Sequence, residues 1–203
     1  MPRFDTRLPP AITTMLQQHG YVRPRDLAAL GVARPHLARL VNRGLLERVG
    51  YGLYRAPDAP ITAHHTLAQV AARAPGGVAC LLTALRFHDL TTQAPFEVWL
   101  AIERKAARPQ LADLPVRIVY FSGAAFATGV EEHRIEGVPV RVYCPAKTVA
   151  DCFKYRHKIG LDVALEALRE TWRARRATMD ELWRYATLCR MANVMRPYME
   201  ALA

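Results

Sequence analysis

The residues best suited to binding chemistry in this sequence are basic side chains spaced through residues 23–55. Between residues 34 and 44 the apolar positions fall on one face of a helix and the basic positions on the rest. The apolar residues are Leu37, Leu40 and Val41, and the basic ones are Arg34, His36, Arg39 and Arg43. Guanidinium groups stay charged and donate to phosphate oxygens and to guanine, so this pattern indicates nucleic-acid binding.

Specific roles follow from position. Arg39 and His36 lie on the outward face of the expected helix, where Arg39 could contact O6 and N7 of guanine. Arg43 and Arg48 flank the helix end and the next strand, where phosphate contacts are expected. Tyr51 lies at a turn and could enter a minor groove, although turn geometry alone also explains an exposed tyrosine. A solvated arginine is the alternative at position 39. The predicted DNA-binding set is Arg23, Arg25, Arg34, His36, Arg39, Arg43, Arg48 and Tyr51.

Two Arg-Pro pairs, Arg23-Pro24 and Arg34-Pro35, mark the expected starts of two short helices, because proline suits a first helical position. Arginine has no acceptor with which to cap a helix. Asp26 can complement the dipole of the first helix, whereas the second has no acid in its first turn. The sequence therefore predicts that a phosphate binds the second helix start, with capping by water as the alternative.

The elements that position these residues are three helices and a ribbon. Residues 11–20 predict a supporting helix, and glycines at 31 and 44 end the two helices that follow. Residues 45–49 and 52–55 predict two strands around a turn at Gly50-Tyr51. Helices followed by a basic hairpin are typical of a winged helix-turn-helix, a module that usually binds DNA.

Few features of the sequence indicate an enzyme. Common phosphate-binding, nucleotide-binding, serine-hydrolase and zinc-protease motifs are absent from the sequence. Glu97, Glu103 and Lys105 lie around an expected strand and leave a nuclease-like enzyme open as an alternative. The adjacent His64 and His65 would point to different sides of a helix, and the four cysteines lack metal-site spacing. We expect no catalysis, no metal and no cofactor; a regulator that senses a small molecule is a further alternative.

Composition agrees with a polyanionic partner. The 203 residues carry a net charge of +10. Residues 1–60 hold nine Lys and Arg against four Asp and Glu, so the excess is densest in the winged-helix segment. An arginine-rich genome alone could also produce a basic protein. No apolar run approaches the ~20 residues of a membrane helix and no signal peptide is visible, which predicts a cytoplasmic protein without membrane contact.

The proline-rich stretch 56–60 predicts a boundary between domains at 1–58 and 61–203. The second domain predicts helices, then strands, then helices, so the expected fold class is α+β with a small, mostly antiparallel sheet and C-terminal helices. Residues 145–158 predict an amphipathic helix whose polar face carries Lys147, Asp151, Lys154 and Lys158, with Tyr155 and Arg156 at its end. Such a face is often merely solvated.

Three segments together resemble one family. They are GLLERVGYGLYR at 44–55, CLLTALRFHDLTTQ at 80–93, and YCPAKTVADCFKYRHKIG at 143–160 followed by LDVALEALRE. The chain is similar to the AbiEi antitoxins and transcriptional regulators of type IV toxin–antitoxin systems, which are linked to phage defence. The resemblance runs from the first helix to about Arg176, and residues 145–156 are its most specific part.

This resemblance implies an N-terminal domain that binds inverted repeats in double-stranded DNA of its own promoter and represses the operon. It also implies a second domain that counteracts a nucleotidyltransferase-type toxin, generally without a stable complex. The expected antitoxin surface is Lys147, Asp151, Lys154, Tyr155 and Arg156. Arg23 and Arg34 stand where the family often has small hydroxyl residues, which leaves the phosphate contacts open.

Overall fold

The computed structural model describes residues 8–50, 52–59 and 61–202. The chain divides into two compact units. The first unit comprises Met1–Arg73 together with Arg134–Val140, and the second comprises Ala74–His133 and Arg141–Ala203. Residues 61–73 thus pack with the N-terminal residues, whereas the sequence placed a domain boundary at 58–61. That boundary stays a prediction about independently folding domains.

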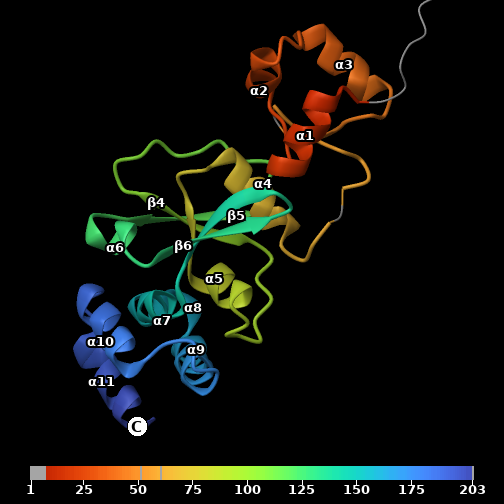
Figure 1. Cartoon of the computed structure of the whole chain (residues 1–203). Coiled ribbons are helices and arrows are strands. Elements are labelled where there is room, and N and C mark those ends of the chain that lie inside the picture. The colour runs from red at the N-terminus through yellow and green to blue at the C-terminus, as the bar shows by residue number, and fades with distance from the viewer. Residues whose placement is uncertain (1–7, 51, 60, 203) are drawn as a thin grey trace, which may run out of the picture. The chain divides into compact units, whose positions relative to one another are not determined.

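The first unit begins with a helix-turn-helix and a wing (Figure 1, red to orange). Its elements are α1 (Pro10–His19), α2 (Pro24–Ala29), α3 (Arg34–Asn42), β1 (Glu47–Gly50), β2 (Leu53–Arg55) and α4 (His65–Arg73). One apolar cluster holds the three helices and the start of the wing together. It consists of Ile12, Val22, Leu27, Leu37, Leu40 and Leu46. The winged helix-turn-helix predicted from the sequence is therefore present.

Both short helices end in the same hydrogen-bonded motif. After α2, Val32 N–H donates to the Leu27 carbonyl at 2.9 Å and Gly31 N–H to the Ala28 carbonyl at 3.0 Å. Gly31 has a φ of +73°, which L side chains rarely adopt. The corresponding glycine after α3 is Gly44, with a φ of +68°. In each turn, N–H groups donate to carbonyls that the end of the helix leaves without partners. These hydrogen bonds fix the direction in which the chain leaves the helix.

The wing is a short antiparallel pair in which Glu47 is opposite Arg55 and Arg48 opposite Tyr54. A third strand segment joins it, because Val22 N–H donates to the Tyr54 carbonyl at 2.8 Å and Tyr54 N–H donates back to Val22 at 3.0 Å. Val22 lies in the link between α1 and α2. The wing is thus bonded to the helical part of the unit rather than only tethered to its end.

The hairpin turn at Glu136-Gly137, between β6 (Val130–Ile135) and β7 (Val138–Tyr143), also belongs to the first unit. Both residues have positive φ values, +51° and +78°. The Glu136 carboxylate accepts hydrogen bonds from the N–H and hydroxyl of Thr62, at 2.7 and 3.0 Å. It also lies 2.7 Å from Nδ1 of His65, and Tyr21 donates its hydroxyl at 3.4 Å. The side chain of Glu136 therefore connects the hairpin turn with the start of α4 and with Tyr21.

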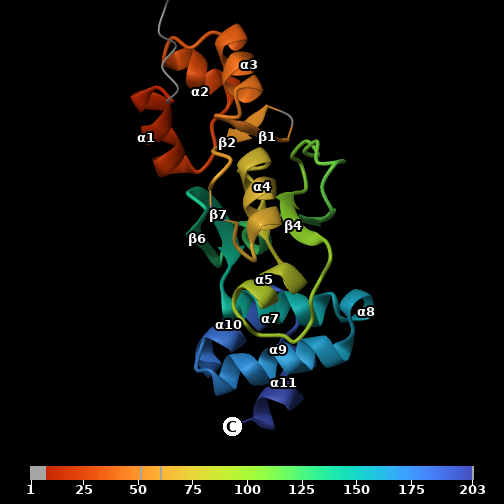
Figure 2. The ribbon, with the colours of Figure 1, turned by 90° about the vertical axis from the view of Figure 1, so that its right-hand side faces the viewer.

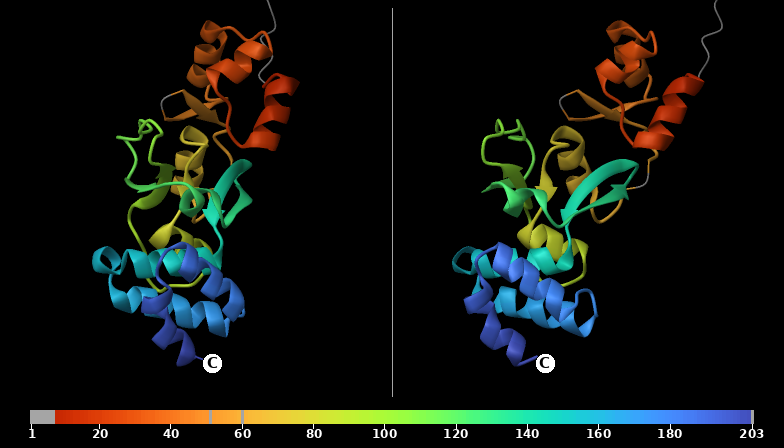
Figure 3. Two further views of the ribbon diagram at one scale, coloured as in Figure 1. Left: turned by 90° about the vertical axis from the view of Figure 1, so that its left-hand side faces the viewer. Right: turned by 60° about the vertical axis from the view of Figure 1, so that its left-hand side comes forward.

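The second unit is a five-stranded sheet with helices to one side of it (Figure 3). Its strands are β3 (Val78–Ala79), β4 (Val98–Glu103), β5 (Val116–Phe121), β6 (Val130–Ile135) and β7 (Val138–Tyr143). Its helices are α5 (Leu81–Phe87), α6 (Ala124–Ala127), α7 (Pro145–Lys154), α8 (Arg156–Ile159), α9 (Leu161–Arg173), α10 (Met179–Leu188) and α11 (Ala192–Glu200). The α+β class predicted from the sequence is confirmed. Within the described ranges, no helix is long and apolar enough to span a bilayer.

The sheet is mixed, which differs from the mostly antiparallel sheet that the sequence predicted. Its strand order is β5-β4-β3-β7-β6; β4 pairs with β5 in parallel, and β3 pairs with β7 in parallel. Residues 104–115 form a long connection that returns the chain to the start of β4, as parallel neighbours require. Of the three pairs β4–β5, β3–β7 and β3–β4, only β3–β4 is antiparallel. Strand β3 is two residues long, too short to show an alternating pattern from which it could be predicted.

Helix α7 forms the centre of the second unit. Figure 2 shows it between α5 and α9, and it also contacts α10 and α11. Every residue from Pro145 to Phe153 is buried. A helix buried all round lies in a core rather than on a surface.

Gly137 provides a test of the hairpin turn. A Cβ at this position would lie 2.4 Å from the Gly20 nitrogen, closer than real contacts allow. Gly31 has a similar φ but nothing within 4 Å of such a Cβ. We expect Gly31→Ala to lower the unfolding free energy by about 1 kcal/mol through φ alone. Gly137→Ala should lose at least about 2 kcal/mol, because strain and clash add. Urea unfolding measures both, and equal losses would contradict the close approach to Gly20.

Candidate nucleic-acid interface

Helix α3 carries the basic residues of the predicted recognition surface. Leu37 and Leu40 are buried against α1 and α2 in the apolar cluster, which orients the opposite face outward. Arg39 is exposed on that face, and its Nε makes only a long contact of 3.5 Å with the Pro35 carbonyl. His36 is half-buried and Arg43 is exposed. The structure thus brings Arg39 and Arg43 together on one surface of one helix.

The start of α3 differs from the sequence prediction. The helix begins at Arg34 after Ala33, one residue earlier than expected, so Pro35 is the second helical residue. Proline has no N–H, and His36 N–H already donates to the Ala33 carbonyl at 2.9 Å. The first turn has no acidic residue, as predicted. Fewer N–H groups are therefore offered to a phosphate than the sequence suggested, and the side chain of Arg34 lies outside the described part of the structure.

Arg23 and Arg25 have different environments. Asp26, predicted to complement the dipole of α2, also accepts a hydrogen bond from the Arg23 N–H at 3.0 Å and so caps the helix. The Arg23 guanidinium donates to the Ala72 carbonyl of α4, and burial lowers the pKa of this side chain. Arg25 is 74% exposed and lies 3.6 Å from Asp26. Arg25 therefore faces solvent, whereas Arg23 holds α2 against α4.

The wing adds one described basic side chain to this surface. Arg48 is exposed on β1, and its Nε donates to the Gly50 carbonyl at 3.2 Å. Tyr51, the predicted wing-tip contact, lies outside the described residues. At the base of the wing, Arg55 pairs with Glu47 at 3.4 Å and is almost fully buried. Arg55 was not among the predicted site residues, because no local sequence pattern indicates that an arginine is buried.

The predicted antitoxin surface is wrong for two of its residues. The side chains of Lys147 and Asp151 are 0% and 2% exposed, and Lys147 Nζ lies 2.5 Å from Asp151 Oδ2. The Lys147 ammonium also lies 4.2 Å from the ring centre of Tyr143 and 4.8 Å from that of Phe121. Asp151 accepts a further hydrogen bond from the Cys189 thiol at 3.3 Å. These charged groups form a core ion pair, so no partner can contact them in this fold.

Burial raises the pKa of Asp151, although Lys147 and the Cys189 thiol counteract that rise. The i, i+4 spacing of the pair is the same on a solvated face and in a core, which explains the error. The rings of Tyr143 and Phe121 come from β7 and β5, so only the folded sheet places them over Lys147.

The other predicted antitoxin residues lie nearer the surface. Lys154 is exposed at the end of α7. Tyr155 is half-buried and stacks on Phe121 at 5.8 Å between ring centres. Arg156 donates to the Phe153 carbonyl at 2.9 Å. Lys154 is therefore the residue of this set most accessible to a partner.

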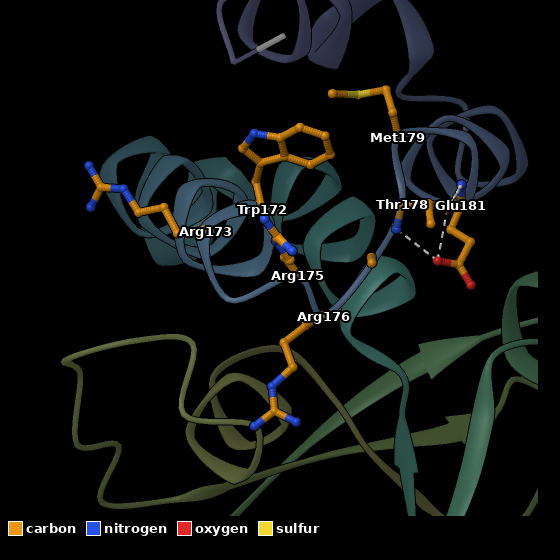
Figure 4. A pocket seen from close by; sticks show the side chains of 8 residues that line it. Trp172, Arg173, Arg175, Arg176, Thr178, Met179 and Glu181 are labelled. Atoms are coloured by element: carbon orange, nitrogen blue, oxygen red, sulfur yellow. Dashed lines mark hydrogen bonds between the residues drawn. The ribbon is translucent and has the colours of Figure 1, made fainter.

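A basic groove of about 720 Å³ lies at the end of α9 (Figure 4). Its walls include Trp172 and three exposed arginines, Arg173, Arg175 and Arg176. Glu181 lines it as well, but its carboxylate accepts hydrogen bonds from Thr178 in the capping box that begins α10. Cations at the C-terminal end of a helix also complement its dipole.

The residues behind the nuclease alternative do not gather into a carboxylate site. Glu97 pairs with Arg117 at 2.6 Å, and Arg117 also lies over the Trp99 ring at 4.6 Å. Across the described ranges, no three His, Cys, Asp or Glu side chains are placed to hold a metal ion.

Comparisons with known proteins agree with the winged-helix segment. Residues 12–57 match the family model described as "Transcriptional regulator, AbiEi antitoxin". The segments of the second unit that carried the resemblance to this family lie outside the matched residues. The fold is similar to the crystal structure of the RV2827C protein from Mycobacterium tuberculosis, with a TM-score of 0.54 and 14% identity. That match covers 98% of this chain and 82% of the other. No curated protein matches the sequence.

The buried ion pair makes a prediction for stability. Lys147→Met leaves Asp151 buried without its counter-charge, so the unfolding free energy should fall by about 3–5 kcal/mol. In this variant the pKa of Asp151 rises further, so the folded state binds a proton that the unfolded state releases. The deficit should therefore be largest at neutral pH and shrink as the pH falls toward about 3.9, the ordinary value of aspartate. Denaturant unfolding across pH measures this.

Two further variants serve as controls. Lys147→Met with Asp151→Leu removes both charges and should recover most of the loss. Lys154→Met changes an exposed lysine of the same helix and should alter stability by less than about 0.5 kcal/mol. A Lys147→Met deficit independent of pH would show that packing, not the ion pair, is responsible.

Proposed function

Because residues 12–57 match the family of AbiEi antitoxin transcriptional regulators, we propose that this protein is a DNA-binding transcriptional repressor. The observation that carries the proposal is the outward face of α3. There Arg39 and Arg43 are exposed, whereas Leu37 and Leu40 of the same helix are buried. A helix held rigidly by its apolar face, with arginines on the other, is what entry into a major groove requires.

We assign the contacts by position. Arg39, in the middle of α3, reads a base edge, and His36 lies one turn before it. Arg43 at the end of α3 and Arg48 on the wing contact phosphates on either side. Arg25 is a further phosphate contact, since its side chain is 74% exposed. Arg23 acts indirectly, because its guanidinium is bonded to the Ala72 carbonyl and holds α2 in place.

The finer part of the proposal concerns regulation. We infer that the chain binds inverted repeats in its own promoter and counteracts a nucleotidyltransferase-like toxin without catalysis of its own. The family description as an antitoxin supports this step. The second unit offers two exposed basic features for it: Lys154 and the groove formed by Arg173, Arg175 and Arg176. A nuclease is less favoured, because Glu97 is already paired with Arg117.

The DNA-binding proposal predicts distinct effects for two arginines. Arg39→Ala should weaken binding to the protein's own promoter by roughly 5- to 150-fold, the usual value of a base contact, and relax sequence preference. Arg43→Ala should weaken binding to all sequences and lower the slope of log affinity against log salt by about one unit. Mobility shifts at several salt concentrations separate the two.

Arg169→Ala is the matched control for this experiment. It removes an exposed arginine from α9 and should leave specific binding unchanged. Unchanged promoter binding by Arg39→Ala would refute the assignment of α3 as the recognition helix.

Repression of the promoter and neutralisation of the toxin should also be separable in cells. Because neutralisation is assigned to the second unit, Arg39→Ala should lose repression of a promoter reporter yet still rescue growth when the neighbouring toxin is expressed. The promoter in the rescue assay must be foreign, so that repression cannot affect toxin level. Loss of rescue by Arg39→Ala at normal protein abundance would show that neutralisation needs DNA binding.

A further inference from the structure

The basic groove at the end of α9 combines an aromatic ring with exposed cations. Trp172 is half-buried, yet it belongs neither to the apolar core of the second unit nor to the described residues packed against that core. Trp99 and Trp183 each have a guanidinium over the ring, at 4.6 and 5.3 Å from the ring centre. Among the described residues, no cation or second ring is placed over Trp172 in this way. Its indole therefore offers a surface on which a planar group can stack.

Two arginines of the groove have no partner for their side chains within the described ranges. Arg175 and Arg176 are exposed, and neither guanidinium takes part in a hydrogen bond or ion pair there. Arg173 differs, because its guanidinium lies 3.1 Å from the carboxylate of Glu170. The carboxylate of Glu181 accepts hydrogen bonds at the start of α10 instead. Three arginines and one glutamate leave the lining with a net charge of +2, which no described carboxylate outside it balances at Arg175 and Arg176.

The backbone fixes the position of Arg175 relative to the indole. The N–H of Arg175 donates to the Trp172 carbonyl at 3.1 Å in the turn that ends α9. In this turn Arg175 has a φ of +52°, where glycine is usual because a Cβ is crowded. Figure 4 shows the Arg175 side chain beside Trp172. The turn therefore holds a cation next to the aromatic ring, at a backbone conformation that arginine rarely adopts.

The basic surface ends at Met179. This residue lines the groove and also a neighbouring pocket of about 380 Å³. The neighbouring pocket carries Asp180 and Glu200 against one arginine, Arg196. A nucleic-acid strand carries a phosphate on each nucleotide and needs a basic surface along its length. The charges therefore favour a ligand that fits within the groove over a strand that continues past Met179.

We propose that this groove binds a nucleoside monophosphate, with the base stacked on Trp172, the phosphate on Arg175, and Arg176 as the second cation of the site. A phosphate monoester carries a charge of about −1.5 to −2 at neutral pH, which matches the net charge of the lining. At about 30 Å³ for each water-sized group, the volume of about 720 Å³ accepts about 24 non-hydrogen atoms, about the size of adenosine monophosphate. The dipole of α9 accounts for cations at its end but not for the uncovered indole beside them.

A role of this site in neutralising a nucleotidyltransferase-like toxin would rest on the proposed function, whereas nucleotide binding itself does not. The test therefore uses the full chain without DNA or toxin. The ¹⁵N-labelled chain is titrated with adenosine monophosphate, and the indole N–H resonance of Trp172 is followed by NMR. The signal that disappears in Trp172→Leu assigns this resonance. We expect a saturable shift.

Two matched ligands separate the base from the phosphate. Adenosine lacks the phosphate and ribose 5-phosphate lacks the base, so each should bind at least about tenfold more weakly than the nucleotide. In Trp172→Leu, nucleotide affinity read from the backbone amides of residues 175–178 should fall by roughly 5- to 150-fold, the usual value of base stacking. The affinity of ribose 5-phosphate for this variant should not change, which a misfolded groove would not allow.

Arg190 provides the matched control for Arg175. It is also exposed and has a φ of +60° in the turn that ends α10, but it does not line the groove. Glycine adopts this φ without steric cost, so neither Arg175→Gly nor Arg190→Gly should lower the unfolding temperature. Arg175→Gly should weaken nucleotide binding at least about tenfold, the value of a charge-assisted hydrogen bond. Arg190→Gly should leave the affinity unchanged.

The proposal is overturned if adenosine monophosphate does not saturate, if either matched ligand binds as tightly, or if Arg190→Gly weakens binding as much as Arg175→Gly does. Equal binding of ribose 5-phosphate would mean that the groove holds an anion only. Equal effects of the two glycine variants would mean that net charge alone attracts the ligand. Tighter binding of an oligothymidylate without terminal phosphates would also overturn the proposal, because the groove would then follow a strand. None of these results affects the DNA-binding proposal, since α3 belongs to the first unit.

Discussion

The presentation of α3 depends on the short hydrogen-bonded turn between it and α2. Two hydrogen bonds, from Val32 to Leu27 and from Gly31 to Ala28, close the end of α2 and send the chain off at a fixed angle. Leu37 and Leu40 then complete the apolar cluster of the first unit. Only with both constraints in place does Arg39 point outward, so the binding face is set by main-chain bonds and apolar packing.

Much of the first unit could be predicted because its signals are local. The glycines after α2 and α3, Asp26 in the first turn of α2 and the Leu37–Leu40 spacing each act within a few residues. The errors came from contacts between distant segments. Arg23 was predicted to bind DNA, yet its guanidinium bonds to the carbonyl of Ala72, almost fifty residues away. Propensity and period carry no information on such pairings.

The second unit shows the same limit more strongly. Lys147 and Asp151 look like one polar face of an amphipathic helix, yet α7 is covered by α5, α9, α10 and α11. The spacing of polar and apolar residues identifies a buried and an exposed helix face only when one face is in contact with water. The parallel pairing of β4 with β5 was equally hidden, because the strand pattern is the same in either direction.

Among the described residues, Lys147 and Arg55 are both buried cations, but their surroundings differ. Lys147 has a carboxylate at 2.5 Å and two aromatic faces within 5 Å, so its environment within the fold is complete. Such a pair contributes little net stability over an apolar core, and its use is to favour one arrangement of the helices. Arg55 shares a single carboxylate at 3.4 Å and leaves two nitrogens without a partner in the described part of the chain. The fold therefore compensates the buried charge of Arg55 less completely than that of Lys147, although both side chains are removed from solvent.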